Sequence, residues 1–421
     1  MGVRITWNDD NTGVDEFRIY RDVSPMDTEM LPAPLASVPS NKLLYDDGTV
    51  EDNTRYYYRV GVVKGTAVAV SNEIFVDVGV VAGRGTVISL AHTNSPFITS
   101  YQWDDATGYG NRYTNPDVLP TGFGVDVTYN PLGSVISVAH YTSPFITSYQ
   151  WDDTTGYGTK YTDPTVPSGD DSIGTTYNPS GSVISISHNT SPFITSYQWD
   201  DTTGYGTKYT NPAVLPAGAG RSPVYNPSGS VLSLVHNDSP FITSYQWDDA
   251  TGFGTKYTDP AVLPAGLGRS VTYNPSGSVI SVAHDNSPRI TSYQWNDTTG
   301  FGTKYANPSV LPTSNGLTVV YNPEGSVISV SQTDSPFITS YQWDDTTGYG
   351  TRYANPDVLP TGSGWAWGAT YNPSGSVISI SHGSLPYIHS YQWDDTTGYG
   401  TKYTNPAVLP AGNGRYGITF N

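Results

Sequence analysis

The chain has 421 residues, no cysteine and a formal net charge of −18. The acidic balance disfavours nucleic acid as a partner, because a phosphate backbone repels negative charge, and the absence of cysteine excludes disulfides and thiol chemistry. Charged residues make up only 13 %, whereas Gly (44), Pro (32) and Tyr (33) are abundant. This composition favours strands and turns over helices, and no stretch is apolar enough for membrane insertion. We therefore expect an all-β protein.

Residues 1–80 differ from the rest of the chain. They contain Trp7 in an alternating stretch, Phe17 to Arg21, and the apolar run Tyr56 to Val60. This pattern, with its early Trp and its Tyr-x-Tyr-Arg-Val strand, resembles a fibronectin type III module. The resemblance implies a small β-sandwich over 1–80. Few residues precede Trp7, so we expect a sheet position left open for a partner's strand.

Residues 81–421 repeat a single unit. Each copy carries a Tyr-Gln-Trp segment, and the spacing is 48 residues five times and then 50, at Trp103, Trp151, Trp199, Trp247, Trp295, Trp343 and Trp393. Each unit holds four short apolar runs bounded by Asn-Pro, Ser-Pro and Gly turns, a pattern typical of a four-stranded antiparallel sheet. The period suits propeller blades. The sequence therefore predicts a seven-bladed β-propeller over 81–421.

The ends of this region predict how the ring closes. The first unit begins at its second strand, near residue 85, and residues 416–421 copy the missing first strand. The C-terminal strand is thus expected to complete the first blade, which leaves no free sheet edge in the ring. The units also resemble WD-repeat blades, with Tyr-Asn-Pro-Ser-Gly at the turn position and Trp-Asp at the end of the third strand.

A pair of acidic residues follows six of the seven repeated Trp, and Asn-Asp follows the fifth. The pairs are Asp104–Asp105, Asp152–Asp153, Asp200–Asp201, Asp248–Asp249, Asn296–Asp297, Asp344–Asp345 and Asp394–Asp395. Seven near-identical copies offer seven similar environments, which argues against one catalytic pair of carboxylates with separated pKa values. A Lys or Arg lies seven residues after the second acid, so we predict a turn that pairs acid with base across two strands. A ring of calcium sites is the alternative, and no metal is expected.

Histidines also recur, eleven residues before the Trp, at His92, His140, His188, His236, His284 and His382, with Gln332 in the sixth unit. Because Gln hydrogen-bonds well but is a poor transition-metal ligand, we predict a hydrogen-bonding role. His389 occurs in one unit only, at a position that otherwise holds Thr. It is interpreted as a tolerated substitution, with an asymmetric site as the alternative.

The return segments between the fourth strand of one unit and the first strand of the next vary most. Variable loops on a rigid scaffold are typical of a binding surface. Aromatic and arginine side chains in these segments suit stacking on a sugar ring or anchoring a protein partner. The predicted ligand-binding residues are Trp365, Trp367, Phe123, Arg221, Arg269 and Arg415.

The repeat phrasing behind a fibronectin-like module also resembles repeat proteins of tailed-bacteriophage particles. The resemblance implies a non-enzymatic virion component, such as a decoration, tail or fibre protein, made in the host cytoplasm. In that interpretation the N-terminal module docks on other virion proteins and the propeller presents a recognition surface to a host glycan or protein. A secreted or surface bacterial lectin-like adhesin is the alternative. No catalytic constellation and no cofactor are expected.

Overall fold

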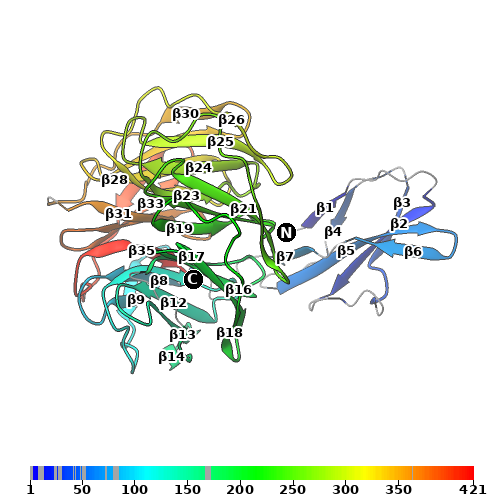
Figure 1. Ribbon diagram of the computed structural model, residues 1–421, viewed down its shortest axis with the longest axis horizontal. Coiled ribbons are helices and arrows are strands. Elements are labelled where there is room, and N and C mark those ends of the chain that lie inside the picture. Colours follow the sequence, from blue (N-terminus) through cyan, green and yellow to red (C-terminus); the bar gives the residue numbers. More distant parts are fainter. Residues whose placement is uncertain are drawn as a thin grey trace. The chain divides into compact units, whose positions relative to one another are not determined.

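The computed structural model describes residues 3–7, 14–22, 26, 31–40, 42, 44–47, 49, 54–71, 74–78, 85–165, 172–362 and 364–421. The chain divides into two compact units, Met1–Arg84 and Gly85–Asn421. Every regular element within these described ranges is a β-strand, as the composition predicts (Figure 1). Accordingly, the described part of the chain holds no helix long and apolar enough to cross a membrane.

The described residues of the first unit form two small sheets. One pairs β1 (Val3–Thr6) with β4 (Leu44–Asp47), and the other contains β2 (Glu16–Asp22), β3 (Ala36–Pro39), β5 (Thr54–Lys64), β6 (Ala67–Val70) and β7 (Ile74–Val78). Phe17, Ile19 and Tyr58 are fully buried, and the Trp7 ring packs edge-on against Phe17 with centroids 5.2 Å apart. The alternating apolar residues of β2 and β5 thus form the core of this unit.

The residues that the structure describes in the second unit form seven four-stranded antiparallel sheets, numbered here in chain order. Sheet 1 contains β8 (Val87–His92), β9 (Ile98–Asp104), β10 (Gly108–Arg112) and β35 (Gly414–Phe420). Sheet 2 contains β11 (Gly124–Tyr129), β12 (Val135–His140), β13 (Ile146–Asp152) and β14 (Gly156–Lys160). Sheet 3 contains β15 (Ser172–Tyr177), β16 (Val183–His188), β17 (Ile194–Asp200) and β18 (Gly204–Lys208).

The remaining four sheets repeat the same order. Sheet 4 contains β19 (Gly220–Tyr225), β20 (Val231–His236), β21 (Ile242–Asp248) and β22 (Gly252–Lys256). Sheet 5 contains β23 (Gly268–Tyr273), β24 (Val279–His284), β25 (Ile290–Asn296) and β26 (Gly300–Lys304). Sheet 6 contains β27 (Gly316–Tyr321), β28 (Val327–Gln332), β29 (Ile338–Asp344) and β30 (Gly348–Arg352). Sheet 7 contains β31 (Ala366–Tyr371), β32 (Val377–His382), β33 (Ile388–Asp394) and β34 (Gly398–Lys402).

The sheets follow one another around an axis, in a propeller-like arrangement. Their inner strands, β11, β15, β19, β23, β27, β31 and β35, contact each other in succession, and β35 contacts β11. The last strand, β35, pairs antiparallel with β8 and places Phe420 opposite Ile88 (Figure 1). The C-terminal strand therefore completes sheet 1, which confirms this part of the prediction.

Aromatic side chains fill the space between neighbouring sheets. Trp151 packs edge-on against Tyr113 of the preceding unit at 5.0 Å and against Tyr129 and Tyr157 of its own sheet. Tyr149 is fully buried, and its hydroxyl donates to the carbonyl of Val118 in the preceding return segment. Equivalent contacts recur around the ring. Since both faces of each sheet are covered, strands such as β12 are buried at every residue.

The two acids of each pair have different roles. The first, such as Asp152, accepts hydrogen bonds from the backbone of Thr154 and Thr155 and holds its own turn. The second, such as Asp201, accepts from Trp199 Nε1 at 2.7 Å and from Asn130 Nδ2 of the preceding sheet at 2.8 Å. The turn prediction is confirmed for the first acid, and the second acid joins neighbouring sheets.

The predicted pairing of these acids with the base seven residues later is wrong. Lys160 lies opposite Tyr149, whereas Asp152 lies opposite Gly156, because the register shifts between Tyr149 and Trp151. The Lys160 ammonium forms an ion pair with Asp163 instead. The spacing in sequence predicted that the acids and this base face each other across the hairpin. The shift in register moves them apart.

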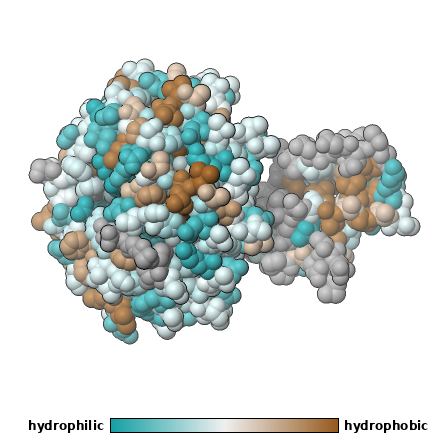
Figure 2. Space-filling model, viewed as in Figure 1, coloured by the Kyte–Doolittle hydropathy of each residue, from teal (hydrophilic) through white to brown (hydrophobic). Residues whose placement is uncertain are grey.

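The surface of the second unit carries both hydrophobic and hydrophilic residues. On the face shown in Figure 2, small hydrophobic patches are separated by hydrophilic residues. The exposed large apolar side chains of this unit include one recurring valine in the return segments, at Val118, Val214, Val262, Val310, Val358 and Val408. Scattered single apolar residues of this kind are ordinary for a protein surface.

Candidate ligand site in the axial channel

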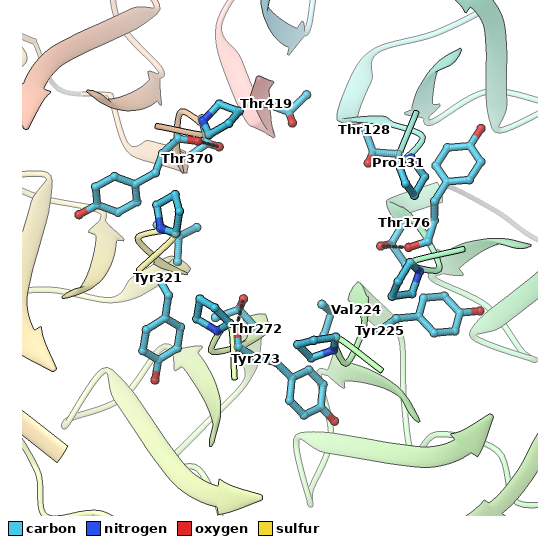
Figure 3. A pocket seen from close by; sticks show the side chains of 18 of the residues that line it. Thr128, Pro131, Thr176, Val224, Tyr225, Thr272, Tyr273, Tyr321, Thr370 and Thr419 are labelled. Carbon is cyan, nitrogen blue, oxygen red and sulfur yellow. Dashed lines mark hydrogen bonds between the residues drawn. The ribbon is translucent and has the colours of Figure 1, made fainter. Parts of the chain in front are cut away.

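The inner strands enclose an axial channel, and its wider end lies at the Asn-Pro turns. This cavity has a volume of about 550 Å³ and is lined by Thr or Val and Tyr or Phe residues of all seven sheets, together with Pro residues of six sheets and Asn residues of five. Figure 3 shows Thr128, Thr176 and Thr272 near the opening, while the rings of Tyr225, Tyr273 and Tyr321 point away from it. Because the sheets contribute similar residues, no single residue of this lining stands out as a candidate catalytic or binding group.

A second cavity of about 200 Å³ lies toward the beginnings of the inner strands. It shares Thr272 and Val320 with the wider cavity, so the two succeed each other along the channel. Its lining differs from sheet to sheet. The polar residues that line it are Asp126, Arg221, Ser222, Arg269, Ser270, Thr272, Thr318 and Tyr416.

Asp126, on β11, is the only carboxylate among the residues that line this narrower cavity. Its Oδ2 accepts a hydrogen bond from the backbone N–H of Thr175 at 2.9 Å, and its Oδ1 accepts from Val127 at 3.0 Å. Burial raises the pKa of Asp126 to about 7, although these two hydrogen bonds oppose the shift. The carboxyl group is therefore divided between its protonated and ionised forms near neutral pH, which suits a group that exchanges protons with a ligand.

Two arginines reach the same cavity from β19 and β23. Arg221 donates from Nε to Asn237 Oδ1 at 2.9 Å. Arg269 forms a two-pronged ion pair with Asp285, at 2.7 and 2.9 Å. Burial lowers the pKa of Arg269, but hydrogen bonds to Asp285 and Tyr416 outweigh it, so the pKa is raised overall. Both guanidinium groups provide N–H donors of a geometry suited to a carboxylate or phosphate.

The third positions of several inner strands form a hydrogen-bonded polar ring around the channel. Ser222 and Ser270 each lie 3.5 Å from the backbone N–H of the next inner strand. Thr318 donates to the carbonyl of Trp367 at 2.8 Å. Asp126 accepts a hydrogen bond from the backbone N–H of Thr175 on β15. These side chains are held in place by the neighbouring sheet, so the cavity wall is preorganised.

The predicted aromatic residues form a cluster beside this cavity. The Trp365 and Trp367 rings lie 4.7 Å apart, and Trp365 is 40 % exposed. The Arg415 guanidinium lies over the Trp367 ring at 4.8 Å, and Tyr416 packs edge-on against Trp367 at 5.1 Å. Because Tyr416 also lines the cavity, it links the aromatic cluster to Arg221 and Arg269. Five of the six predicted residues are thus arranged around one channel end.

Phe123 is the exception. It is 49 % exposed and lies between Phe97 at 6.4 Å and Tyr141 at 6.5 Å. It is absent from the lining of the narrower cavity.

The sequence interpretation missed Asp126, Tyr416 and the polar ring. A signal for them exists in the repeat itself. The third position of the inner strand reads Asp126, Gly174, Ser222, Ser270 and Thr318 in successive units, whereas the Tyr that ends each of these strands does not change. The third position thus varies within a strand whose last residue is repeated. Such variation indicates a position at which the sheets differ in chemistry.

The repeated histidines are structural, as predicted. His140 Nε2 lies 2.9 Å from Thr147 Oγ1, and the same bond occurs in sheets 1, 3, 4 and 5. Gln332 makes the corresponding bond to Thr339 at 3.3 Å. No group of three or more His, Asp or Glu side chains positioned to hold a metal ion occurs among the residues that the structure describes.

No known family model and no curated protein matches the chain. Among solved structures it is similar to a candidate 6-phosphogluconolactonase from Bacteroides fragilis NCTC 9343, with TM-score 0.64, 13 % identity, and coverage of 82 % of this chain and 100 % of the other. It is also similar to the periplasmic gluconolactonase PpgL of Pseudomonas aeruginosa, with TM-score 0.60, 13 % identity, and coverage of 79 % and 98 %. The β-propeller domain of Cps50 (Swd1) from Myceliophteria thermophila gives TM-score 0.51 at 12 % identity, with coverage of 68 % and 88 %. These likenesses establish a propeller-like fold.

The prediction of a non-enzymatic bacteriophage virion component is wrong. Two of the three similar structures are bacterial proteins named as lactonases, and none of the three is a phage protein or an adhesin. The names also conflict with the expectation that the protein is not an enzyme. A location in the virion has no support from these structures, one of which is periplasmic.

Proposed function

We propose that the second unit binds a small anionic sugar-acid lactone in the narrower channel cavity and hydrolyses its ester bond. The observation that carries this proposal is the placement of Asp126, with its pKa of about 7, in the same cavity as Arg221 and Arg269. A proton-accepting group beside two anion-binding groups on different sheets is a combination that such a reaction can use.

In the proposed reaction, the ionised Asp126 accepts a proton from a water molecule as the water oxygen attacks the lactone carbonyl carbon. The ring C–O bond then breaks, and the leaving ring oxygen takes up the proton that Asp126 accepted, which gives the open hydroxy acid and returns Asp126 to its ionised form. Arg221 and Arg269 hold the ligand's anionic group and stabilise the negative charge that develops on the carbonyl oxygen. The polar ring residues Ser222 and Ser270 provide further hydrogen-bonding groups for the sugar hydroxyls.

The names of similar structures favour this reaction class over others. The relevant names are a candidate 6-phosphogluconolactonase and a periplasmic gluconolactonase. Their low identity means that the proposal depends on the residues of this chain. The uniform lining of the wider cavity offers no comparable set of groups.

We also propose that the seven sheets are the seven blades of one closed propeller over 81–421, and that residues 1–80 form a fibronectin type III-like module. The unbroken succession of inner-strand contacts supports the first point. The buried Phe17 and Tyr58 beside Trp7 support the second. An experimental structure of the full chain would test both points.

Hydrolysis is best tested on the purified full chain with gluconolactone and its 6-phosphate, with the spontaneous reaction subtracted. We expect turnover by the wild type, a loss of at least about 100-fold for Asp126→Asn, and a loss of at least about 10-fold for Arg221→Ala that is larger for the phosphorylated substrate.

The matched control is Arg112→Ala, on the outer strand of sheet 1, which should leave turnover unchanged. If the folded wild type hydrolyses neither lactone faster than buffer, or if Asp126→Asn retains full activity, the proposed function is wrong.

A further inference from the structure

The return segment between β30 and β31 differs from the other return segments in length and in composition. The last two repeated Trp residues lie 50 residues apart, whereas the others follow at 48, and the two additional residues fall in this segment. The segment and the start of β31 also carry Trp365 and Trp367, the two tryptophans of the chain that are neither repeated nor part of the first unit. Sheet 7 therefore has a pair of indole rings that the other sheets lack.

The backbone that carries these two rings is held in place. The Gly383 N–H donates to the carbonyl of Trp365 at 2.9 Å, and the Thr318 hydroxyl donates to the carbonyl of Trp367 at 2.8 Å. A Cβ atom at Gly364 would lie 2.5 Å from the backbone carbonyl carbon of Gly383, so the close approach of the two segments requires glycine. Because the backbone is fixed, a ligand that binds the rings loses little affinity to the ordering of this segment.

The two rings offer an apolar surface with hydrogen-bond donors beside it. Trp365 is 40 % exposed, and its ring centroid lies 4.7 Å from that of Trp367. The Arg415 guanidinium lies 4.8 Å from the centre of the Trp367 ring and provides N–H donors. A pyranose ring combines an apolar face of C–H groups with a rim of hydroxyls. It matches an indole in size, and the hydroxyls of its rim can accept hydrogen bonds from Arg415.

A protein partner is a poorer match for this surface. A stable protein interface buries roughly 800 Å² on each partner, which is far more than two indole rings offer. A sugar ring, in contrast, covers a single indole. The size of the surface therefore favours a sugar as its occupant.

The indole pair is continuous with the narrower channel cavity. Tyr416, which lines that cavity, packs edge-on against Trp367 with centroids 5.1 Å apart. Thr318, which holds the Trp367 backbone, lines the cavity as well. The cavity volume of about 200 Å³ lies below the roughly 300–1,000 Å³ of typical ligand pockets. One sugar ring is therefore the most that the cavity holds, and a larger ligand extends to the indole rings.

We propose that this site takes a disaccharide, in which the lactone ring occupies the narrower cavity beside Asp126 and a second pyranose ring stacks on Trp365. The identity of the first ring rests on the proposed lactone hydrolysis. The second ring takes no part in that reaction, which opens the ring ester and leaves the glycosidic bond between the two sugars intact. Its contact with Trp365 raises the affinity for the disaccharide above the affinity for the monosaccharide.

Binding of the open acids to the full chain tests this proposal without turnover. Calorimetric titration compares gluconate with cellobionate and maltobionate, which add a β-linked or an α-linked second ring to the same acid. The wild type should bind at least one of the two disaccharide acids about 10-fold more tightly than gluconate. Trp365→Ala should remove this advantage, since loss of a stacked Trp typically costs 10-fold or more. Trp365→Tyr, which keeps an aromatic ring, should retain most of it.

The matched control is Phe123→Ala. Phe123 is an aromatic residue of another return segment, it is 49 % exposed, and it does not line the narrower cavity. Its removal should leave the ratio of the two affinities unchanged. Circular dichroism verifies that each variant is folded, and the wild-type comparison of the three acids decides the matter even where a variant does not fold.

Equal affinity of the wild type for gluconate and both disaccharide acids would overturn the proposal. An advantage that persists in folded Trp365→Ala, or that Phe123→Ala removes to the same extent, would overturn it as well. Hydrolysis of gluconolactone without a preference for disaccharide acids would leave the proposed function standing and this inference wrong. A Trp365-dependent preference in a protein that hydrolyses no lactone would have the opposite meaning, so the two proposals fail separately.

Discussion

At the scale of single residues, Asp126 combines a cost to the fold with the role in lactone hydrolysis that we propose for it. Its carboxyl group is surrounded by strands of other sheets, and only two backbone N–H groups stabilise its charge. Ionising it in the folded protein is therefore unfavourable. A residue whose ionised form strains the fold is typical of a functional site, where activity and stability conflict.

This conflict predicts a pH-dependent effect of Asp126→Asn. The folded pKa of about 7 lies above the ordinary value of 3.8, so the folded state holds its proton longer than the unfolded chain. The contribution of Asp126 to stability is full below pH 4 and is lost as pH rises to about 7. Replacement by neutral Asn removes that loss, which is on the order of 4 kcal/mol for a difference of about three pKa units. Denaturant unfolding at pH 5 and pH 8 measures this effect. The free energy of unfolding of the variant, relative to that of the wild type, should be higher at pH 8 than at pH 5.

Asp152→Asn is the control for this measurement. Backbone hydrogen bonds from Thr155 and Thr154 lower the pKa of Asp152, so this carboxylate is ionised in both states above pH 5. Its replacement should change stability by the same amount at pH 5 and pH 8. An Asp126→Asn variant that behaves in the same way would show that Asp126 has an ordinary pKa.

At the scale of structural elements, the hairpin after each Trp joins neighbouring sheets. Asp201 bridges Trp199 of its own sheet and Asn130 of the preceding one, and it also accepts from Ser134 at 3.0 Å. Asp200, its neighbour in sequence, bonds only within its own turn in the contacts given by the structure. The two adjacent acids thus differ in what they stabilise.

We therefore predict that Asp201→Ala is more damaging than Asp200→Ala. Loss of Asp201 leaves the buried Asn130 amide and the Trp199 indole N–H short of an acceptor, which costs about 2–3 kcal/mol. Loss of Asp200 removes a turn cap, at about 1 kcal/mol. Equilibrium unfolding of the second unit measures both. Equal losses would mean that the bridge between the sheets contributes nothing.

The sequence predicted local elements well and contacts between sheets poorly. The turns at Asn130 and Asp152 and the burial of Trp151 could be inferred, because each depends on residues close in the chain. The Asn130–Asp201 bridge spans 71 residues, and the Lys160 register depends on a shift within the hairpin. The pKa of Asp126 could not be predicted either, because the strands that bury it belong to other sheets.

At the scale of the whole molecule, closure of the ring depends on the last residues of the chain. β35 provides the inner strand of sheet 1, and Phe420 packs against Trp103 at 5.5 Å. Asn421 accepts from the backbone N–H of Val87 at 3.0 Å and donates to Asp153 at 2.6 Å. Sheet 1 is thus held by both ends of the second unit.

Deleting residues 415–421 should therefore open the ring. It exposes the edge of β8 and uncovers the faces of β11 and β31, which pack against β35. We expect a fall in melting temperature of at least about 10 °C, since several large side chains lose their burial. An internal control is a deletion within the exposed turn at Gly65, in the first unit. A melting temperature unchanged by the C-terminal deletion would contradict closure by β35.

The dependence of lactone hydrolysis on pH tests the central claim, catalysis by Asp126 in the channel, most directly. If Asp126 is the base, enzyme-catalysed kcat/KM rises with pH through an apparent pKa of about 7 and reaches a plateau, since only the ionised form accepts a proton. In Asp126→Asn the pH-dependent component disappears. A wild-type profile without a transition between pH 6 and 8, or the same transition in Asp126→Asn, would contradict the account.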